Sequence, residues 1–342
     1  MGFIGALVAV IVLMLIPLLG WAANLNSLFG VVIPYLAALT FFVGLVYKVV
    51  SWGKSPVPFR IPTTAGQGKS MPWIKTNPID NPSNMGGVIA RMALEVLCFR
   101  SLFRNISLDF RHGRAYYSSA KWLWLFALVF HYSFLVVLVR HLRFFTQPVP
   151  YVIQVLEKLD GFFQIGLFPF SSLPGLLLSG AALIGAATYL LLRRVVIPQL
   201  RYISLANDWF PLLLIIHIAA TGLIMRYILK VDVVAVKQLA MGLVHFSPSI
   251  PEGVGVIFYI HLFLVCALFA YFPFSKLMHA PGVFLSPTRN LVNNSREVRH
   301  ENPWNPKVKT HDYHEYEDDF REFMVEAGLP LDKEEDEAEG KE

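Results

Sequence analysis

Long runs of apolar residues dominate this chain, and most polar residues lie between the runs. A helix needs about 20 apolar residues to cross the hydrocarbon core of a bilayer. The runs predict six spans, at about residues 3–23, 28–50, 121–142, 174–193, 209–229 and 256–277. The fold class expected from this pattern is all-α, an integral helical bundle in the cell (cytoplasmic) membrane.

The charges between the runs alternate from loop to loop. Basic residues outnumber acidic ones in segments 51–120 and 193–208, whereas the charges of segments 143–173 and 230–255 are nearly balanced. Because Lys and Arg are enriched in cytoplasmic loops, we expect the two basic segments and both termini on the cytoplasmic side. The formal net charge of +5 therefore reflects membrane orientation and does not indicate nucleic-acid binding.

Composition narrows the possible chemistry. Hydrophobic residues make up 55% and charged residues 15% of the chain, far from the average of soluble proteins. The two cysteines, Cys98 and Cys266, do not form a C-x-x-C or C-x-x-C-H motif, which argues against an iron–sulfur cluster, a cysteine zinc site and a covalently attached haem. The first run, Phe3 to Leu19, has no basic region before it, so we interpret it as a retained span and not as a signal peptide.

The basic 51–120 segment contains a second type of pattern. Residues 56–82 are rich in Pro and Gly and predict irregular structure. Residues 88–104 predict an amphipathic helix, because apolar side chains recur at helical spacing at Met92, Val96, Phe99 and Phe103. A basic helix of this kind suits an inner membrane surface or the groove of a partner. A short helix packed on neighbouring loops fits the pattern equally well.

Four histidines lie in or next to two of the apolar runs. His131 and His141 are ten residues apart, about 15 Å along a helix axis. His261 and His279 are eighteen residues apart, about five turns, which returns the second ring to the same face of a continuous helix. Since the two spans run in opposite directions, His131 matches His279 in depth near the cytoplasmic side, and His141 matches His261 near the outer side.

Paired imidazoles at two depths indicate haem. A histidine inside a membrane span is costly unless it has a partner or a ligand. One imidazole from each of two facing helices fills both axial positions of a haem iron. We therefore predict two haem b groups, with iron ligands His131 and His279 on the inner side and His141 and His261 on the outer side. The unequal separations require helix tilt or a kink at Pro273; the alternative is four hydrogen-bonded packing residues.

Three further polar residues lie close to these positions. His217, at about the depth of the inner pair, could bond a haem propionate, take part in proton movement or replace His279 as a ligand. It could also simply bond a neighbouring helix. Arg140 and Arg143 flank His141 and could neutralise propionates, although long basic side chains also extend to the interface without any ligand.

The histidine-containing segments resemble a known family. Residues 258–264 (Phe-Tyr-Ile-His-Leu-Phe-Leu) and 271–279 (Tyr-Phe-Pro-Phe-Ser-Lys-Leu-Met-His) resemble the last helix of the cytochrome b (gamma) subunit of respiratory nitrate reductase. That family has two histidines at this separation and two more, ten residues apart, in an earlier helix. The resemblance covers roughly residues 28–285. The extra first span, the long basic segment and His217 depart from it.

The Pro-rich segment after the second span and the acidic tail are more similar to the DsrM family. These proteins are dihaem membrane subunits of the DsrMKJOP redox complexes of sulfate, sulfite and sulfur metabolism, related to the membrane subunit of heterodisulfide reductase. The resemblance implies an electron-transfer subunit of an oxidoreductase complex that exchanges electrons with menaquinone. It also implies a cytoplasmic iron–sulfur partner resembling heterodisulfide reductase, further membrane subunits, and periplasmic partners that include a c-type cytochrome.

The same resemblance suggests where the parts lie. We expect an extra transmembrane helix at 1–27, a dihaem cytochrome b domain at 28–285 and a cytoplasmic tail with an acidic end at 286–342. A quinol pocket is expected beside the outer haem, where Lys158 would contact a quinone oxygen; the alternative for Lys158 is a solvated interface charge. Aromatic residues of the tail would suit docking to a cytoplasmic partner.

Other functions stay open at this stage. A nitrate reductase gamma subunit or a heterodisulfide reductase membrane subunit would also be an electron-transfer protein, with different partners. A transporter could use histidines and arginines within the membrane as a proton relay. A haem-free membrane anchor would keep the basic segment and the tail but would not need paired histidines.

Overall fold

The computed structural model describes residues 2–55, 73, 75, 77–111, 113–162, 177–286, 289–292 and 310–332. Six helices in this part of the chain are long and apolar enough to cross a membrane, which confirms the predicted spans. They comprise α1 (Gly2–Ala22), a π-helical turn followed by α2 (Ile33–Gly53), α5 (Lys121–His141), α7 (Leu178–Val196), α9 (Ala206–Leu223) and α11 (Val256–Tyr271). The Pro-rich residues 56–72 and the acidic end at 333–342 lie outside the described residues.

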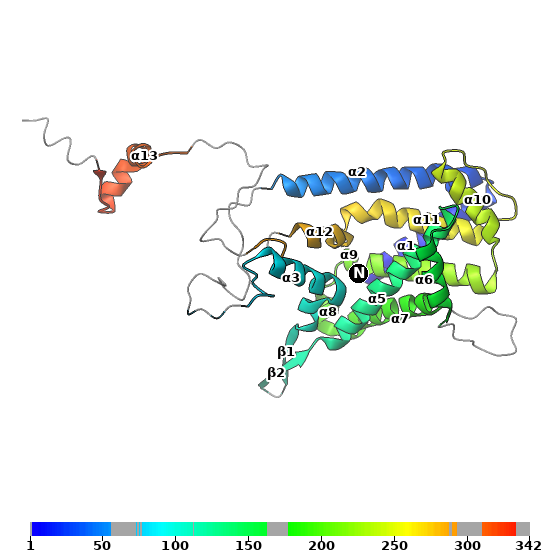
Figure 1. Ribbon diagram of the computed structural model, residues 1–342, viewed down its shortest axis with the longest axis horizontal. Helices are drawn as coiled ribbons and strands as arrows, with labels where there is room; N and C mark the ends of the chain where they lie inside the picture. The colour runs from blue at the N-terminus through cyan, green and yellow to red at the C-terminus, as the bar shows by residue number, and fades with distance from the viewer. Residues whose placement is uncertain are drawn as a thin grey trace, which may run out of the picture.

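The spans form a bundle in which neighbours along the chain are mostly neighbours in space (Figure 1). Helix α7 packs between α5 and α9, and α11 packs on α9 and α2. The N-terminal helix α1 packs on both α9 and α11. Their shared core consists of the buried side chains Ala6, Val10, Trp209, Leu213, Leu214, Ile260 and Leu264. Within the described part of the chain, α5 and α11 do not pack closely along their lengths.

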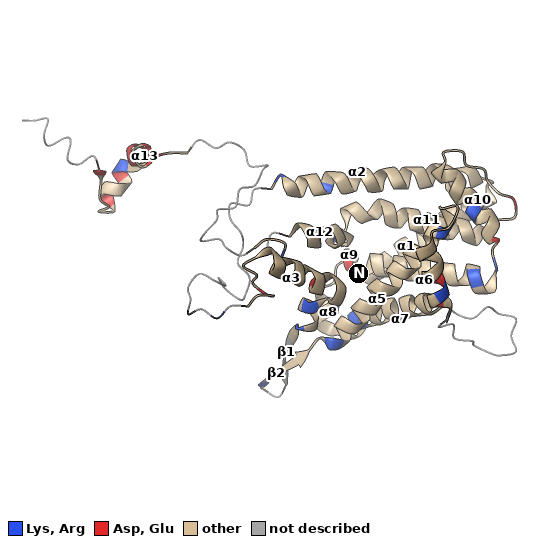
Figure 2. Cartoon of the chain, viewed as in Figure 1, with Lys and Arg blue, Asp and Glu red and all other residues tan. Residues whose placement is uncertain are grey.

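Short elements cover the two ends of the bundle. One end carries α3 (Met85–Cys98), α8 (Pro198–Ile203) and α12 (His279–Leu285), and the other carries α6 (Tyr151–Phe162) and α10 (Val233–Val244) (Figure 1). Charged positions concentrate at the two ends of the spans, and the middle of the spans is almost free of them (Figure 2). This distribution is the one expected for a bilayer-spanning bundle. By the loop charges, we expect the end with α3 and α8 on the cytoplasmic side.

The predicted helix at 88–104 is two helices, not one. Helix α3 ends at Cys98, Phe99 adopts a left-handed conformation with φ of 50°, and α4 (Arg100–Phe103) begins at the next residue. The Glu95 side chain, expected to be off the apolar stripe, is buried and accepts hydrogen bonds from the backbone N–H and hydroxyl of Ser101. Glu95 therefore satisfies donors at the start of α4, which stabilises the break.

A β-hairpin follows α4 and was not predicted by the apolar pattern. Strands β1 (Ile106–Arg111) and β2 (Arg114–Ser119) are antiparallel, with Leu108 opposite Tyr117. The predicted helical bundle is confirmed, and the hairpin is an element added to it. Strand β1 alternates apolar and polar residues over only six positions, and β2 (Arg-Ala-Tyr-Tyr-Ser-Ser) does not alternate, so the pattern contains no clear strand signal.

The last span does not continue as one helix to His279. Two 3₁₀ turns, Phe272–Phe274 and Lys276–Met278, follow α11, and Ser275 between them is extended. The expected kink at Pro273 is thus a complete break. The expectation that five continuous turns place His261 and His279 on one face is wrong, because His279 begins the separate helix α12. A final helix in the tail, α13, covers Tyr313–Glu326.

Candidate functional site

The structure brings the four histidines together in two pairs. The rings of His131 on α5 and His279 on α12 have centroids 5.9 Å apart, with an angle of 86° between their planes. The rings of His141 at the end of α5 and His261 on α11 have centroids 6.5 Å apart, with planes at 17°. His261 and His279 are eighteen residues apart, whereas their partners His141 and His131 are only ten residues apart. The break after α11 allows both pairs to form despite this difference.

These separations fit a metal between the rings. A metal–imidazole bond is about 2 Å long. With about 1.1 Å from each bonded nitrogen to its ring centre, two axial imidazoles on one haem iron have centroids about 6 Å apart. The residues therefore fit haem at both levels.

Hydrogen bonds at Nδ1 orient all four rings. In each pair, Nδ1 bonds a nearby oxygen, so the other ring nitrogen, Nε2, is the one left for a metal. The oxygen partners are the carbonyls of Ala127 for His131 (2.7 Å), of Val137 for His141 (2.7 Å) and of Lys276 for His279 (2.9 Å), and the hydroxyl of Thr221 for His261 (2.9 Å). Metal-binding histidines usually have such a bond, which selects the tautomer and the ring orientation.

Thr221 is a residue of this site that the sequence did not single out. It is buried on α9, and its hydroxyl lies 2.8 Å from the carbonyl of His217 and 2.9 Å from Nδ1 of His261. The hydroxyl can donate to the carbonyl and accept from the imidazole. A polar residue in an apolar span, one helical turn after a histidine, was the available signal.

His217 lies between the two pairs in depth. It is four residues before Thr221, which touches the outer pair, and so lies about 6 Å deeper along α9. Its Nδ1 bonds the carbonyl of Leu213 at 2.7 Å. Among the described residues, the His131 ring contacts Phe99, Phe130 and His279, and not His217.

The cytoplasmic segment covers the inner pair. The Phe99 ring, at the break between α3 and α4, meets the His131 ring edge-on at 4.9 Å. Two side chains of α5 hold this end of α3: Trp124 donates to the carbonyl of Cys98 (2.7 Å), and Tyr132 donates to that of Leu97 (2.9 Å). The left-handed Phe99 therefore places an apolar ring on the inner site.

Arg140 belongs to a buried polar cluster next to His141. Its Nη1 donates to Asp160 Oδ2 (2.7 Å) and to Ser179 Oγ (3.2 Å), and the Ser179 N–H donates to Asp160 Oδ1 (2.8 Å). The side chains of Arg140 and Asp160 are 13% and 5% exposed. Among the residues that the structure describes, buried Arg140 Nε has no hydrogen-bond partner. A buried donor without a partner fits an anionic group, such as a haem propionate.

The other two predicted residues lie on or against α6. Arg143 forms an ion pair with Glu157, and together with the Arg140–Asp160 pair this ties α6 to the end of α5. Lys158 is exposed on α6. Its sequence neighbour Glu157 forms its ion pair with Arg143. The sequence did not single out Asp160 or Ser179; a carboxylate in the segment following Arg140 was the available signal.

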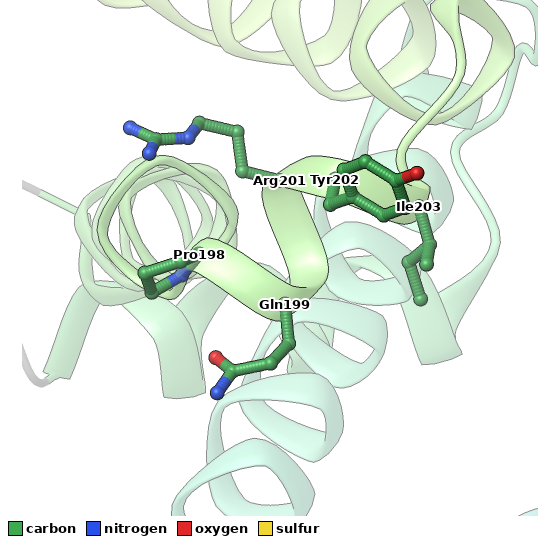
Figure 3. A pocket seen from close by; sticks show the side chains of 5 residues that line it. All are labelled: Pro198, Gln199, Arg201, Tyr202 and Ile203. Carbon is green, nitrogen blue, oxygen red and sulfur yellow. The ribbon is translucent and has the colours of Figure 1, made fainter.

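A surface hollow of about 580 Å³ lies at α8, at the opposite end of the spans from α6 (Figures 1 and 3). Its lining residues all come from this one short helix: Pro198, Gln199, Arg201, Tyr202 and Ile203. None of the candidate haem ligands lines it. The hollow therefore does not mark the expected quinol pocket beside the outer pair.

Comparison with known proteins identifies the family of this chain. A sequence profile described as "Nitrate reductase gamma subunit" matches residues 92–301, a stretch that contains all four paired histidines. A protein of Archaeoglobus fulgidus is 44% identical over 289 residues, which are 82% of this chain and 85% of that protein. One of Archaeoglobus profundus is 41% identical over 280 residues, 80% and 82% of the two chains. Both are described as an "Hdr-like menaquinol oxidoreductase cytochrome b-like subunit".

Proposed function

Because this chain belongs to the nitrate reductase gamma subunit family, we propose that it carries electrons across the membrane between menaquinol and a cytoplasmic iron–sulfur subunit. The chain is a cytochrome b-like membrane protein. The observation that carries the proposal is the meeting of His131 with His279 and of His141 with His261 at two depths. Paired imidazoles about 15 Å apart along α5 suit transfer of electrons from one side of the membrane to the other.

Four residues would hold two haem b groups: His131 and His279 on the inner side, His141 and His261 on the outer side. When bound, haem b would supply reversible one-electron chemistry. The chain itself fixes the ligands. Their Nδ1 hydrogen bonds select the tautomer, and the Phe99 ring packs edge-on against the His131 ring.

The quinol site of the proposal lies beside the outer pair, near α6. Menaquinol loses two electrons and two protons when it is oxidised, so the site needs groups that bind the quinol oxygens and pass protons to the outer solution. Lys158 is exposed on α6 and can meet a quinone oxygen from the solvent side. Arg140, with its buried Nε unpartnered, would neutralise a propionate of the outer haem.

The partners follow from the relatives. Since two relatives are described as subunits of an Hdr-like menaquinol oxidoreductase, we propose that this chain also binds an Hdr-like iron–sulfur subunit on its cytoplasmic side. The Pro-rich segment after the second span and the acidic tail favour a complex of sulfur or sulfite metabolism, with further membrane subunits and a periplasmic c-type cytochrome. A nitrate reductase would instead copurify with a nitrate-reducing catalytic subunit.

The haem proposal is tested by the reduced-minus-oxidised spectrum of the purified full chain, with haem quantified as pyridine haemochrome. We expect two haem b per chain, and one in each of His131→Ala, His279→Ala, His141→Ala and His261→Ala. His245→Ala is the matched control, because its Nδ1 also bonds a carbonyl (Met241) although the residue is outside both pairs. Absence of haem from folded, haem-supplied protein would contradict the proposal and favour a transporter or an anchor.

The quinol proposal is tested separately on the membrane complex. A menaquinol analogue is expected to reduce the haem absorbance, and Lys158→Ala is expected to raise the quinol concentration needed for half-maximal rate without loss of haem. An unchanged concentration dependence would remove Lys158 from the site. Identification of the copurified subunits separates a sulfur-metabolism complex from a nitrate reductase.

A further inference from the structure

The β1–β2 hairpin exposes one complete apolar face. Side chains alternate between the two faces of a strand, so Ile106, Leu108 and Phe110 of β1 share a face. Tyr117 of β2 lies opposite Leu108 and joins them. These side chains are 62%, 51%, 70% and 72% exposed, respectively, in the described part of the chain. A two-stranded hairpin is at best marginally stable alone in water, so this apolar face requires a cover.

The hairpin begins and ends at the membrane surface. Its base is closed by a hydrogen bond from the N–H of Ala120 to the carbonyl of Asn105, at 3.1 Å. The span of α5 begins at Lys121, two residues after β2 ends. Each strand has six residues and is about 20 Å long. Figure 1 shows the hairpin extending beyond the helices at the end where α3 and α8 lie.

Basic and aromatic residues surround this base. Arg114 starts β2, and Lys121 and Trp122 start α5; all three are exposed. The tip of the hairpin is coloured for Lys or Arg in Figure 2, and α8 contains Arg201 next to the highly exposed Tyr202. Aromatic rings and cationic side chains are enriched at the boundary between lipid and water, and cations are attracted to the anionic lipids of the cytoplasmic leaflet.

We propose that the hairpin is a membrane-surface anchor, with the face formed by Ile106, Leu108, Phe110 and Tyr117 lying on anionic phospholipid of the cytoplasmic leaflet. Lys121, at the base of the hairpin, contacts the lipid phosphates, and Arg114 adds positive charge at its tip. Lipid is the occupant that the position favours, because the bilayer adjoins Lys121 whether or not other subunits are bound. Since the hairpin leads directly into α5, the anchor also restrains the helix that carries His131. This inference does not depend on haem or on the identity of the partner.

The test compares the two faces of the hairpin in the full-length protein. A spin label is placed at Leu108→Cys or, as the matched control on the opposite face, at Tyr116→Cys. Both are made in a Cys98→Ser background, where the remaining Cys266 is buried. The proteins are reconstituted in nanodiscs of phosphatidylcholine with or without phosphatidylglycerol. Accessibility to oxygen reports contact with lipid, and accessibility to a water-soluble nickel complex reports contact with water.

In nanodiscs with phosphatidylglycerol, we expect the label at 108 to be oxygen-accessible and protected from nickel, and the label at 116 to be nickel-accessible. Replacing Arg114 and Lys121 by Glu is expected to remove the protection at 108. Nickel access at 108 in these nanodiscs would overturn the proposal. Protection that occurs only when the cytoplasmic subunits are present would also overturn it and show a protein-docking face. Tyr117→Cys gives a second label on the same face if Leu108→Cys does not fold.

Discussion

At the scale of single residues, hydrogen bonds determine what each candidate ligand can do. Three of the four paired histidines bond a backbone carbonyl, which substitution of a side chain cannot remove. His261 differs, because besides a backbone bond to Ile218 its Nδ1 meets a side chain, the Thr221 hydroxyl, which a substitution can remove. The outer site can therefore be perturbed without changing any histidine.

Thr221→Val is expected to weaken the outer haem site while leaving the inner one intact. Loss of such a supporting bond typically lowers metal affinity or activity about 10- to 100-fold. Haem titration of the apoprotein and redox titration of the two haems measure the effect. Thr221→Ser keeps the hydroxyl and is the control. Equal changes at both haems in Thr221→Val would contradict the assigned contact.

Asp160→Ala is expected to destabilise the outer end of the bundle. Because both side chains of the Arg140–Asp160 pair are largely buried, removal of Asp160 leaves an uncompensated buried charge, which costs about 3–5 kcal/mol. The matched control is Glu157→Ala, whose pair with Arg143 is more exposed, at 37% and 30%, and is worth about 0–1 kcal/mol. Thermal unfolding measures both, and similar melting temperatures for the two variants would contradict this ranking.

At the scale of elements, the inner site depends on how α2 supports the end of α11. A Cβ atom on Gly44 of α2 would lie 2.7 Å from Cβ of Pro273, which is closer than real contacts allow. The close approach of α2 positions the break after α11, and this break sets where α12 places His279. Helix–helix contacts of this kind commonly use small residues in membranes.

Gly44→Val is therefore expected to displace the Pro273 turn and to lower the content of the inner haem, with little effect on the outer one. Haem quantitation together with the spectra of the two haems measures this selectivity. Gly5→Val is the control, because a Cβ at Gly5 meets no atom within 4 Å. If Gly44→Val kept both haems fully, the proposed support of His279 by α2 would be wrong.

The ion pairs that join α4 to Asp80 are expected to depend on pH. Hydrogen bonds from Arg100 and Arg104 hold the pKa of Asp80 well below its ordinary value of 3.8. Because the pKa of Asp80 is lower in the folded state, its ion pairs stabilise the folded segment at any pH above the unfolded-state pKa. This stabilisation is lost as the pH falls and the carboxylate is protonated. Backbone hydrogen exchange in α4 should therefore increase as the pH falls below about 4. Asp80→Asn should exchange faster at neutral pH and lose this dependence; an unchanged profile would contradict it.

At the scale of the whole molecule, the two cytoplasmic surfaces have opposite character. The hairpin end is basic, whereas Arg321 is the only Lys or Arg between residues 310 and 332. Helix α13 in this segment exposes Tyr316, Phe320 and Phe323 among acidic residues. Anionic lipid repels such a helix, so a basic, partly apolar face on the cytoplasmic subunit is the expected partner.

Removal of residues 310–342 is accordingly expected to leave both haems and to abolish copurification of the cytoplasmic subunit. Haem quantitation and affinity purification from membranes measure the two properties independently. Phe320→Ser with Phe323→Ser should reproduce the loss of the partner with the tail still present. Full retention of the partner by the truncated chain would place docking elsewhere.

The spans and the identity of the paired histidines could be predicted from the sequence. Apolar runs of about 20 residues and the rise of a helix per residue are local properties, and they place His131 and His141 at two depths without knowledge of any neighbour. The break after α11 was only partly predictable. Pro273 indicated a kink, but the separate helix that begins at His279 depends on packing against α2.

Local patterns in the sequence are therefore sufficient for the membrane spans and the candidate ligands. Helix packing was needed to show that Thr221 bonds His261, that Arg140 meets Asp160 and Ser179, and that Phe99 contacts His131. These contacts join segments 20 to 40 residues apart in the sequence. Such contacts depend on how the helices pack, and no local pattern of apolar and polar residues encodes them.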